Sequence, residues 1–220
     1  MQTTIRIEFY FDPISPYTWL ASRQFERLES AGAELDFRPV LFAGLLAAHG
    51  QKGPAEIPAK RAYTIRDVLR IAGGLGLSVV GPPTHPFNPL RALRMCIALD
   101  DGADRRRFGL ALLEACWARG LDLTDEAVLL ALARDCELDG PGLLARAGAA
   151  DVKQGLIEAT EGAVALGIFG VPTFRFDGEI FWGEDRIDAL LRRLRGQTID
   201  ESLLARILAR PASAVRKPGQ

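Results

Sequence analysis

The chain is poor in cysteine and histidine, which excludes two common kinds of site. Its three cysteines, Cys96, Cys116 and Cys136, are too far apart for a Cys-x-x-Cys redox or metal pair. All three fall in apolar segments predicted to be helical, which favours reduced, partly buried thiols. The two histidines, His49 and His85, have no ligand spacing to a cysteine, so no metal site is expected and neither is assigned a catalytic role.

Net charge and long apolar runs are also lacking. The formal net charge of −1 gives no reason to expect nucleic acid or an anionic membrane as a partner. No apolar run is long enough to span a bilayer, and residues 1–4 do not begin a secretory signal, which predicts a cytoplasmic protein. The 220 residues suffice for one large domain, or for a domain with a sizeable insertion.

The beginning of the chain has the pattern of a strand, a helix and a second strand. Apolar side chains alternate over residues 5–11, which predicts a strand. Ser15 and Pro16 predict a helix start, because serine caps helices and proline suits the first helical position; we expect this helix to end near Ala31. Residues 34–41 alternate again, and the intervening helix is long enough for a parallel crossover.

The middle of the chain, residues 43–150, has helical periodicity and almost no strand signal. We therefore predict an all-helical insertion domain over this range. Its expected helices lie near residues 58–75, 88–100, 104–118, 125–135 and 141–148.

From residue 151 the α/β pattern resumes. A helix is expected to end near Gly167, followed by two strands that Asp177 and Gly178 join in a two-residue hairpin turn. Glu184 and Asp185 then open another helix. Asp200 caps a short last helix, and residues 211–220 are predicted to be a disordered tail.

The order of elements predicts an α/β fold of the thioredoxin type. The order β-α-β, helical insertion, α-β-β-α would build one mixed four-stranded sheet. Residues 1–42 and 151–210 would form the thioredoxin-like domain, and residues 43–150 would be inserted after the second strand.

Ser15 is the first candidate site residue. As a helix cap, its hydroxyl would lie beside unpaired backbone N–H groups at the positive end of the helix dipole, where a thiolate is favoured. Taken locally, a serine cap is more often purely structural. The functional interpretation gains weight because thioredoxin folds carry their chemistry in the loop after the first strand.

Val171 and Pro172 form the second candidate, at the position of the cis-proline in thioredoxin folds. A cis bond there would leave the Val171 backbone free to pair with an extended peptide. An ordinary trans proline at the start of a strand is the alternative.

Two polar segments are weaker candidates. Residues 183–186 begin a predicted helix, so their N–H groups suit a carboxylate, and Asp185 suits an amino group. Residues 51–54, together with Lys60 and Arg61, form a partly basic segment that could cover a ligand and supply cations to its carboxylates. Ordinary helix-start charge is a common alternative for the first segment, and a solvated surface is the better explanation for most residues of the second.

Together these residues resemble a family. The chain is similar to 2-hydroxychromene-2-carboxylate isomerase and kappa-class glutathione transferase, both built on the DsbA-like version of the thioredoxin fold. The matching segments run in the family order over nearly the whole chain, at residues 11–17, 38–41, 50–54, 58–61, 167–174 and 181–186.

This resemblance implies glutathione as the cofactor. Ser15 would hydrogen-bond the glutathione sulfur and favour its thiolate. Val171, before a cis-Pro172, would pair with the cysteinyl part, and Glu184 and Asp185 would hold the γ-glutamyl end.

Three further positions follow from the resemblance. Lys60 stands where the family has a lysine near the ligand, and Asp67 where it has an acidic residue. Gln51 would also contact glutathione, at a position where kappa transferases commonly carry asparagine.

The implied activity is the glutathione-dependent interconversion of 2-hydroxychromene-2-carboxylate and trans-o-hydroxybenzylidenepyruvate in aromatic catabolism, carried out by a homodimer. A kappa-like transferase that conjugates electrophiles would use the same site and remains an alternative. An inactive thiol-binding protein also remains open. A DsbA-like thiol–disulfide oxidoreductase is disfavoured, because residues 15–18 contain no cysteine.

Overall fold

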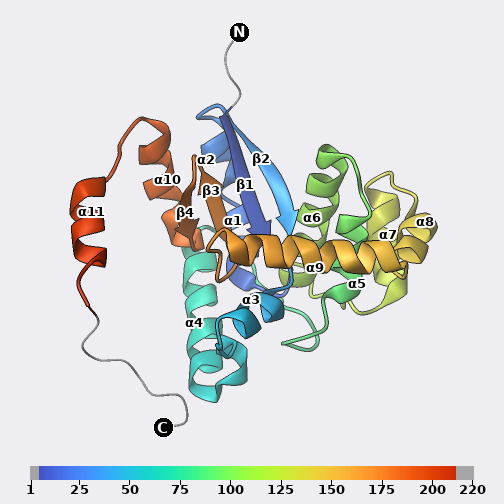
Figure 1. The fold of residues 1–220 in the computed structure, drawn as a ribbon. Coiled ribbons are helices and arrows are strands. Elements are labelled where there is room, and N and C mark those ends of the chain that lie inside the picture. Colours follow the sequence, from blue (N-terminus) through green and yellow to red (C-terminus); the bar gives the residue numbers. More distant parts are fainter. Residues whose placement is uncertain (1–4, 212–220) are drawn as a thin grey trace.

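The computed structural model, which describes residues 5–211, contains one mixed four-stranded sheet (Figure 1). The strand order is β2-β1-β3-β4, with β1 and β2 parallel and the other neighbours antiparallel. This confirms the predicted thioredoxin order of elements. The strands are β1 Ile5–Phe11, β2 Ala33–Pro39, β3 Thr173–Phe176 and β4 Glu179–Trp182.

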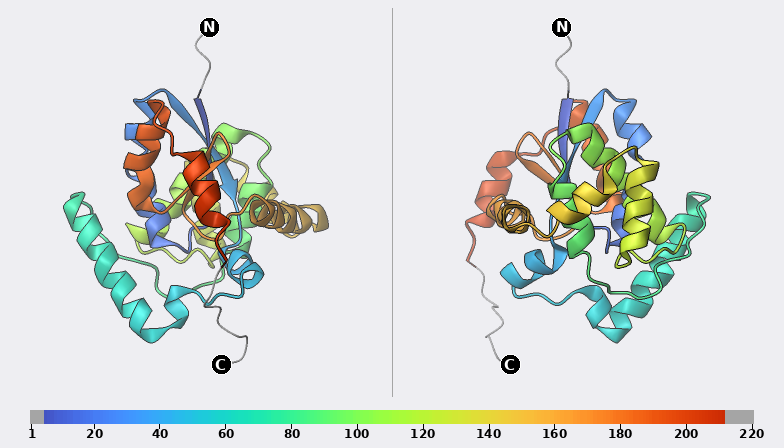
Figure 2. Two further views of the ribbon diagram at one scale, coloured as in Figure 1. Left: turned by 60° about the vertical axis from the view of Figure 1, so that its left-hand side comes forward. Right: turned by 90° about the vertical axis from the view of Figure 1, so that its right-hand side faces the viewer.

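Helices surround this sheet, and most of them lie between β2 and β3 in the sequence. Figure 2 shows α4 standing out from the body of the molecule, and α11 has no buried residue. The helices are α1 Pro16–Ser22, α2 Phe25–Glu29, α3 Phe42–Ala48, α4 Pro58–Gly74, α5 Leu90–Ile97, α6 Gly102–Trp117, α7 Glu126–Asp135, α8 Gly140–Arg146, α9 Ala150–Ala165, α10 Ile187–Leu194 and α11 Glu201–Leu208, with 3-10 turns η1 Pro54–Glu56 and η2 Glu184–Arg186.

Three local features differ from what the sequence predicted. The helix expected to end near Ala31 is two helices, α1 and α2, because the Ser22 hydroxyl bonds the Trp19 carbonyl and the chain turns there before Phe25 is buried. The short helix α3 was not predicted. Finally, Glu184 and Asp185 form the 3-10 turn η2, and the α-helix begins only at Ile187.

Other local predictions were confirmed. Ser15 caps α1, and Asp200 caps α11 by accepting a hydrogen bond from the Leu203 N–H. Asp177 and Gly178 both have positive φ, at 51° and 81°, as a two-residue hairpin turn requires. Of the predicted tail, residues 212–220 lie outside the described part of the chain.

The two faces of the sheet are packed differently. Ile7, Phe9 and Phe11 of β1 face the main apolar core, where Phe9 contacts Phe25, Phe37 and Phe174 edge-on or tilted. The side chains between them in β1 point to the opposite face of the sheet. A smaller cluster there joins Tyr10, Val40, Leu45, Ala163, Ile168 and Val171 below α9. Within residues 5–211, no helix has the length and apolarity that crossing a membrane requires.

Candidate functional site

Ser15 lies in the loop between β1 and α1. The Thr18 N–H donates to its Oγ over 3.4 Å, and the Ser15 hydroxyl donates to the Val171 carbonyl oxygen, also over 3.4 Å. Both distances are long for a hydroxyl, although Ser15 is only 7% exposed. Weak contacts therefore hold the hydroxyl in place, and a stronger acceptor such as a thiolate could take the place of the Val171 carbonyl as the acceptor of its hydrogen.

Val171 and Pro172 approach Ser15 from the start of β3. Both residues are buried, and the peptide bond between them is cis. The Pro172 carbonyl accepts a hydrogen bond of 3.0 Å from Gly183 N, which ties this segment to the end of β4. The hydrogen bonds among the described residues include none from the Val171 N–H. An extended ligand would thus find an unpaired donor next to an accepting carbonyl.

Glu184 and Asp185 lie in η2, which packs against α1. The Glu184 carboxylate accepts a hydrogen bond of 3.4 Å from Gln24 Nε2. Burial, and then the negative charge of Asp185, raise the pKa of Glu184 above its ordinary value. Asp185 itself is exposed and pairs with Arg186 at 3.2 Å.

Asp67 connects α4 to the start of α1. Its Oδ2 accepts a hydrogen bond of 2.9 Å from the Tyr17 hydroxyl. Burial, together with this bond to Asp67, raises the pKa of Tyr17. The charge of Asp67 also contributes to the raised pKa of Glu184, so α4 and η2 both lie near the start of α1.

Lys60 and Gln51 lie farther out. Lys60 is exposed in the first turn of α4, about 10 Å along the helix from Asp67. Gln51 is exposed in the loop after α3, where its N–H closes the helix end by donating to the Leu46 carbonyl over 2.9 Å. We call Ser15, Val171 and Pro172 the inner part of the site, and Gln51, Lys60, Glu184 and Asp185 its outer part.

A hollow of about 470 Å³ follows the first turns of α4. Arg61 is the positively charged residue that lines this hollow. Its charge also helps to lower the pKa of His85, whose ring contacts the Ser15 loop at Ile14. The other lining residues are Ala55, Pro58, Ala62 and Ile65.

Comparison with known proteins identifies the family. A family model of the DsbA-like thioredoxin domain matches residues 6–195. The chain belongs to the DsbA-like thioredoxin family.

Two kinds of relative are similar over most of the chain. A 2-hydroxychromene-2-carboxylate isomerase of Sphingobium xenophagum is 28% identical, over 85% of this chain and 96% of its own length. Human glutathione S-transferase kappa 1 is also 28% identical, over 87% of this chain and 91% of its own length. A solved structure of 2-hydroxychromene-2-carboxylate isomerase has a TM-score of 0.78 at 22% identity, covering 93% and 96% of the two chains, and shows the same fold.

Asp12 is a residue of this DsbA-like site that the sequence analysis missed. Its fully buried carboxylate accepts hydrogen bonds of 3.0 Å from Ile14 N and Phe42 N. Burial raises the pKa of Asp12 to about 7, although both hydrogen bonds act to lower it. Asp12 therefore fixes the Ser15 loop against the start of α3.

His85 and Trp117 hold the same loop from the helical segment. His85 Nε2 lies 3.0 Å from the Ile14 carbonyl oxygen, and since a carbonyl only accepts, Nε2 carries the hydrogen. Burial lowers the pKa of His85, which favours the neutral ring. Trp117 packs against this ring and donates to the Pro13 carbonyl over 2.9 Å. No local pattern marks either residue, because both contacts join distant parts of the chain.

The three cysteines are buried, as expected. Burial raises the pKa of the Cys96, Cys116 and Cys136 thiols, so each resists forming a thiolate. None of them takes the place of a redox cysteine in the loop that Ser15 occupies.

Proposed function

We propose that this DsbA-like protein is a glutathione-dependent isomerase that interconverts 2-hydroxychromene-2-carboxylate and trans-o-hydroxybenzylidenepyruvate. The observation that carries the proposal is the hydroxyl of Ser15, held at the α1 cap opposite Val171 and the cis-Pro172. The relatives named for this isomerase and for kappa transferase support the choice of cofactor and reaction.

The residues present fit glutathione. The unpaired Val171 N–H, together with the Val171 carbonyl, suits the peptide backbone of an extended ligand. Glu184 and Asp185 supply carboxylates for an amino group, and Lys60 is an exposed cation for a carboxylate. When bound, glutathione would supply a nucleophilic thiolate that adds reversibly to an electrophilic carbon.

Ser15 contributes electrostatic stabilisation in this proposal. Its hydroxyl donates a hydrogen bond to a sulfur anion, which favours the thiolate over the thiol. Because Asp12 and His85 fix the loop on either side, the hydroxyl is positioned before a ligand arrives. Neither Asp12 nor His85 touches the reacting atoms.

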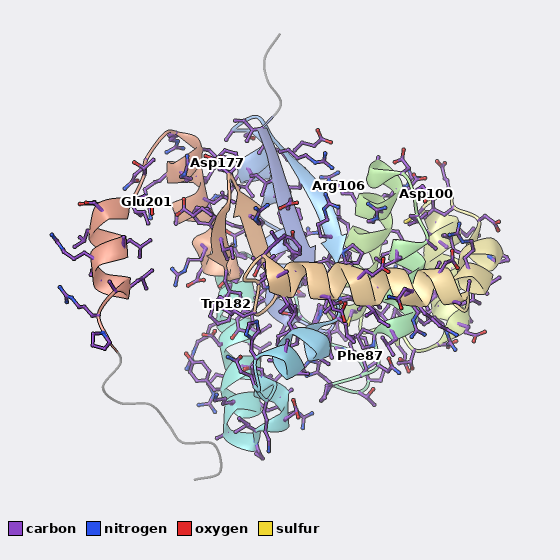
Figure 3. All side chains as sticks on the ribbon, in the orientation of Figure 1. Phe87, Asp100, Arg106, Asp177, Trp182 and Glu201 are labelled. Carbon is purple, nitrogen blue, oxygen red and sulfur yellow. The ribbon has the colours of Figure 1, made fainter. Side chains whose placement is uncertain are left out.

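The substrate of the proposed reaction is an aromatic carboxylate, and the outer surface offers matching groups. Arg61 in the hollow along α4 suits its carboxylate. Trp182, labelled in Figure 3, is 51% exposed and packs edge-on against Phe169 with ring centroids 4.9 Å apart. These rings offer an apolar surface close to Val171.

The decisive experiment is turnover of 2-hydroxychromene-2-carboxylate by the purified protein, with and without glutathione. Absorbance would follow the equilibration, and mass spectrometry would identify the product. Glutathione-dependent equilibration without an adduct supports the isomerase. No turnover, combined with no glutathione binding by calorimetry, would refute the proposal.

A kappa-like glutathione transferase is the second candidate. The specific observation in its favour is that the human kappa 1 enzyme is as similar to this chain as the Sphingobium isomerase, at 28% identity. One thiolate site serves both reactions. A product that retains glutathione in the experiment above would assign the protein to the transferases.

We also propose that the protein acts in the cytoplasm as a homodimer. Tyr63 and Leu69 of α4 and Leu208 of α11 are among its most exposed large apolar side chains, and burying them would favour association. Light scattering on the purified protein measures the mass directly. A monomer at micromolar concentration would contradict the dimer.

A further inference from the structure

A second pocket lies on the opposite face of the sheet from the aromatic core. In Figure 1, α9 crosses this face, and the pocket lies between α9 and strands β1 and β2. Its volume is about 340 Å³, within the range of small-ligand sites. It shares no lining residue with the inner or outer part of the glutathione site.

Small residues of α9 create this space. Ala159, Gly162 and Ala163 line the pocket from the helix, and a Cβ added at Gly162 would meet no atom within 4 Å. Apolar side chains with accessible surface come from Ile97 of α5 and from Leu166 at the end of α9. The pocket therefore suits a ligand with an apolar body.

Arg105 supplies a cation whose charge is not neutralised locally. Its Nε donates to the Cys96 carbonyl over 3.2 Å, and its Nη2 donates to the Leu99 carbonyl. These neutral acceptors hold the guanidinium in place without cancelling its charge. Among the salt bridges of the described residues, none involves Arg105, so its guanidinium remains available to pair with the carboxylate of a ligand.

The other charged groups of the pocket are already paired. Arg38 lies 2.6 Å from Asp36, and Glu8 lies 2.7 Å from Arg175 and accepts a hydrogen bond of 3.3 Å from the Tyr10 hydroxyl. Three charged residues line the pocket, Arg38, Arg105 and Glu8, and their sum is one positive charge. A monoanion would balance that charge.

We propose that this pocket binds a small aromatic monocarboxylate at a site separate from the glutathione site. The carboxylate would pair with Arg105, and the ring would lie against Ile97 and Leu166. This inference does not rest on the proposed isomerase activity, because the two sites share no residue.

Benzoate is a suitable probe, measured by calorimetry and by amide chemical shifts on the full chain. We expect saturable binding at one site, shifts centred on α9 and β2, and at least a tenfold loss in Gly162→Leu. Leucine would fill the open space, and its higher helix propensity than glycine keeps α9 intact. Arg105→Gln should also weaken binding.

Two controls separate this site from the other. Gly73→Leu also adds a side chain to open space on a helix, α4, and should leave benzoate binding unchanged. Ser15→Ala should also leave it unchanged, and Gly162→Leu should bind glutathione as the unaltered protein does. Absence of saturable binding, full binding by Gly162→Leu, or displacement of benzoate by glutathione would each overturn the proposal.

Discussion

The inner and outer parts of the candidate site differ in how firmly the protein holds them. Ser15, Val171 and Pro172 are buried beside the central strands β1 and β3, where Ser15 bonds Val171 and Gly183 bonds Pro172. Gln51, Lys60 and Asp185 are exposed, on three different segments of the chain. A group fixed before the ligand arrives acts on the chemistry, whereas an exposed charge acts mainly on binding and is screened by solvent.

The largest expected effect is at the inner part. Ser15→Ala should lower turnover by about 10²- to 10³-fold, the usual result of removing one preorganised donor to a developing anion. Loss of the helix cap should destabilise the fold by only about 1 kcal/mol. Steady-state kinetics with saturating glutathione measures the loss of turnover, and urea denaturation measures the loss of stability.

Ser22→Ala is the matched control for this change. Ser22 lies at the other end of α1, and its hydroxyl donates to the Trp19 carbonyl over 2.7 Å. Its loss should leave turnover nearly unchanged. Equal losses in both variants would mean that α1 matters only as a structural element.

Asp12→Asn tests the support of the inner part. One of the two N–H groups loses its acceptor, which should cost about 1–3 kcal/mol of unfolding free energy. Because burial raises the pKa of Asp12 from 3.8 to about 7, the folded state keeps a proton that the unfolded state loses between these values. The contribution of Asp12 to stability therefore falls as pH rises through that window, and asparagine should abolish this dependence.

Urea denaturation across the same window measures this effect. Asp101→Asn is an informative contrast, because the pKa of Asp101 is lowered by its hydrogen bonds to Asp104 N and Ala103 N. Asp101 should therefore contribute stability that increases as pH rises, and Asp101→Asn should remove that dependence. An unchanged pH profile in Asp12→Asn would contradict the buried, protonated state.

Glu184→Gln tests the outer part by its pH dependence. The ionised carboxylate attracts the amino group of glutathione, so affinity should fall as pH drops through the raised pKa of Glu184. The variant should bind about tenfold more weakly at neutral pH, equivalent to about 1.4 kcal/mol, and should lack this pH dependence. Calorimetry over a pH series measures both; a variant with the same profile as the unaltered protein would remove Glu184 from the site.

The smallest effect is expected at Lys60. As an exposed cation it should contribute at most about 1 kcal/mol to glutathione binding, a factor of about five, and added salt should reduce this further. Lys60→Gln measured at two salt concentrations gives the contribution. Lys153→Gln, an exposed lysine on α9, is the control. If Lys60→Gln weakened glutathione binding more than tenfold, Lys60 would not be acting as a solvent-screened surface charge, which would contradict this assignment.

Local patterns predicted what local physics decides. The pair Ser15-Pro16 predicted the α1 cap, and Asp177-Gly178 predicted the hairpin turn, because each conformation depends on adjacent residues. The order of elements placed Val171 and Pro172 just before a strand, as found, whereas the cis geometry of Pro172 could not be decided from sequence.

Contacts between distant segments could not be predicted. His85 meets Ile14 across 71 residues, and Trp117 meets Pro13 across 104, with no periodicity to indicate either pairing. The break between α1 and α2 depends on where Phe25 is buried, which the fold decides. The predicted division at residue 43 stays a prediction, although α3 packs on α9 and Leu45 joins the cluster around Val171.

The central claim is that Ser15 stabilises a glutathione thiolate, and the most direct measurement is the thiol pKa of bound glutathione by ultraviolet thiolate absorbance. The protein's own cysteines add little thiolate absorbance, because burial raises the pKa of Cys96, Cys116 and Cys136. In the unaltered protein the bound thiol should titrate well below the value of about 8.5 for a free cysteine thiol, and in Ser15→Ala it should return toward that value. The same pKa in both proteins would contradict the account.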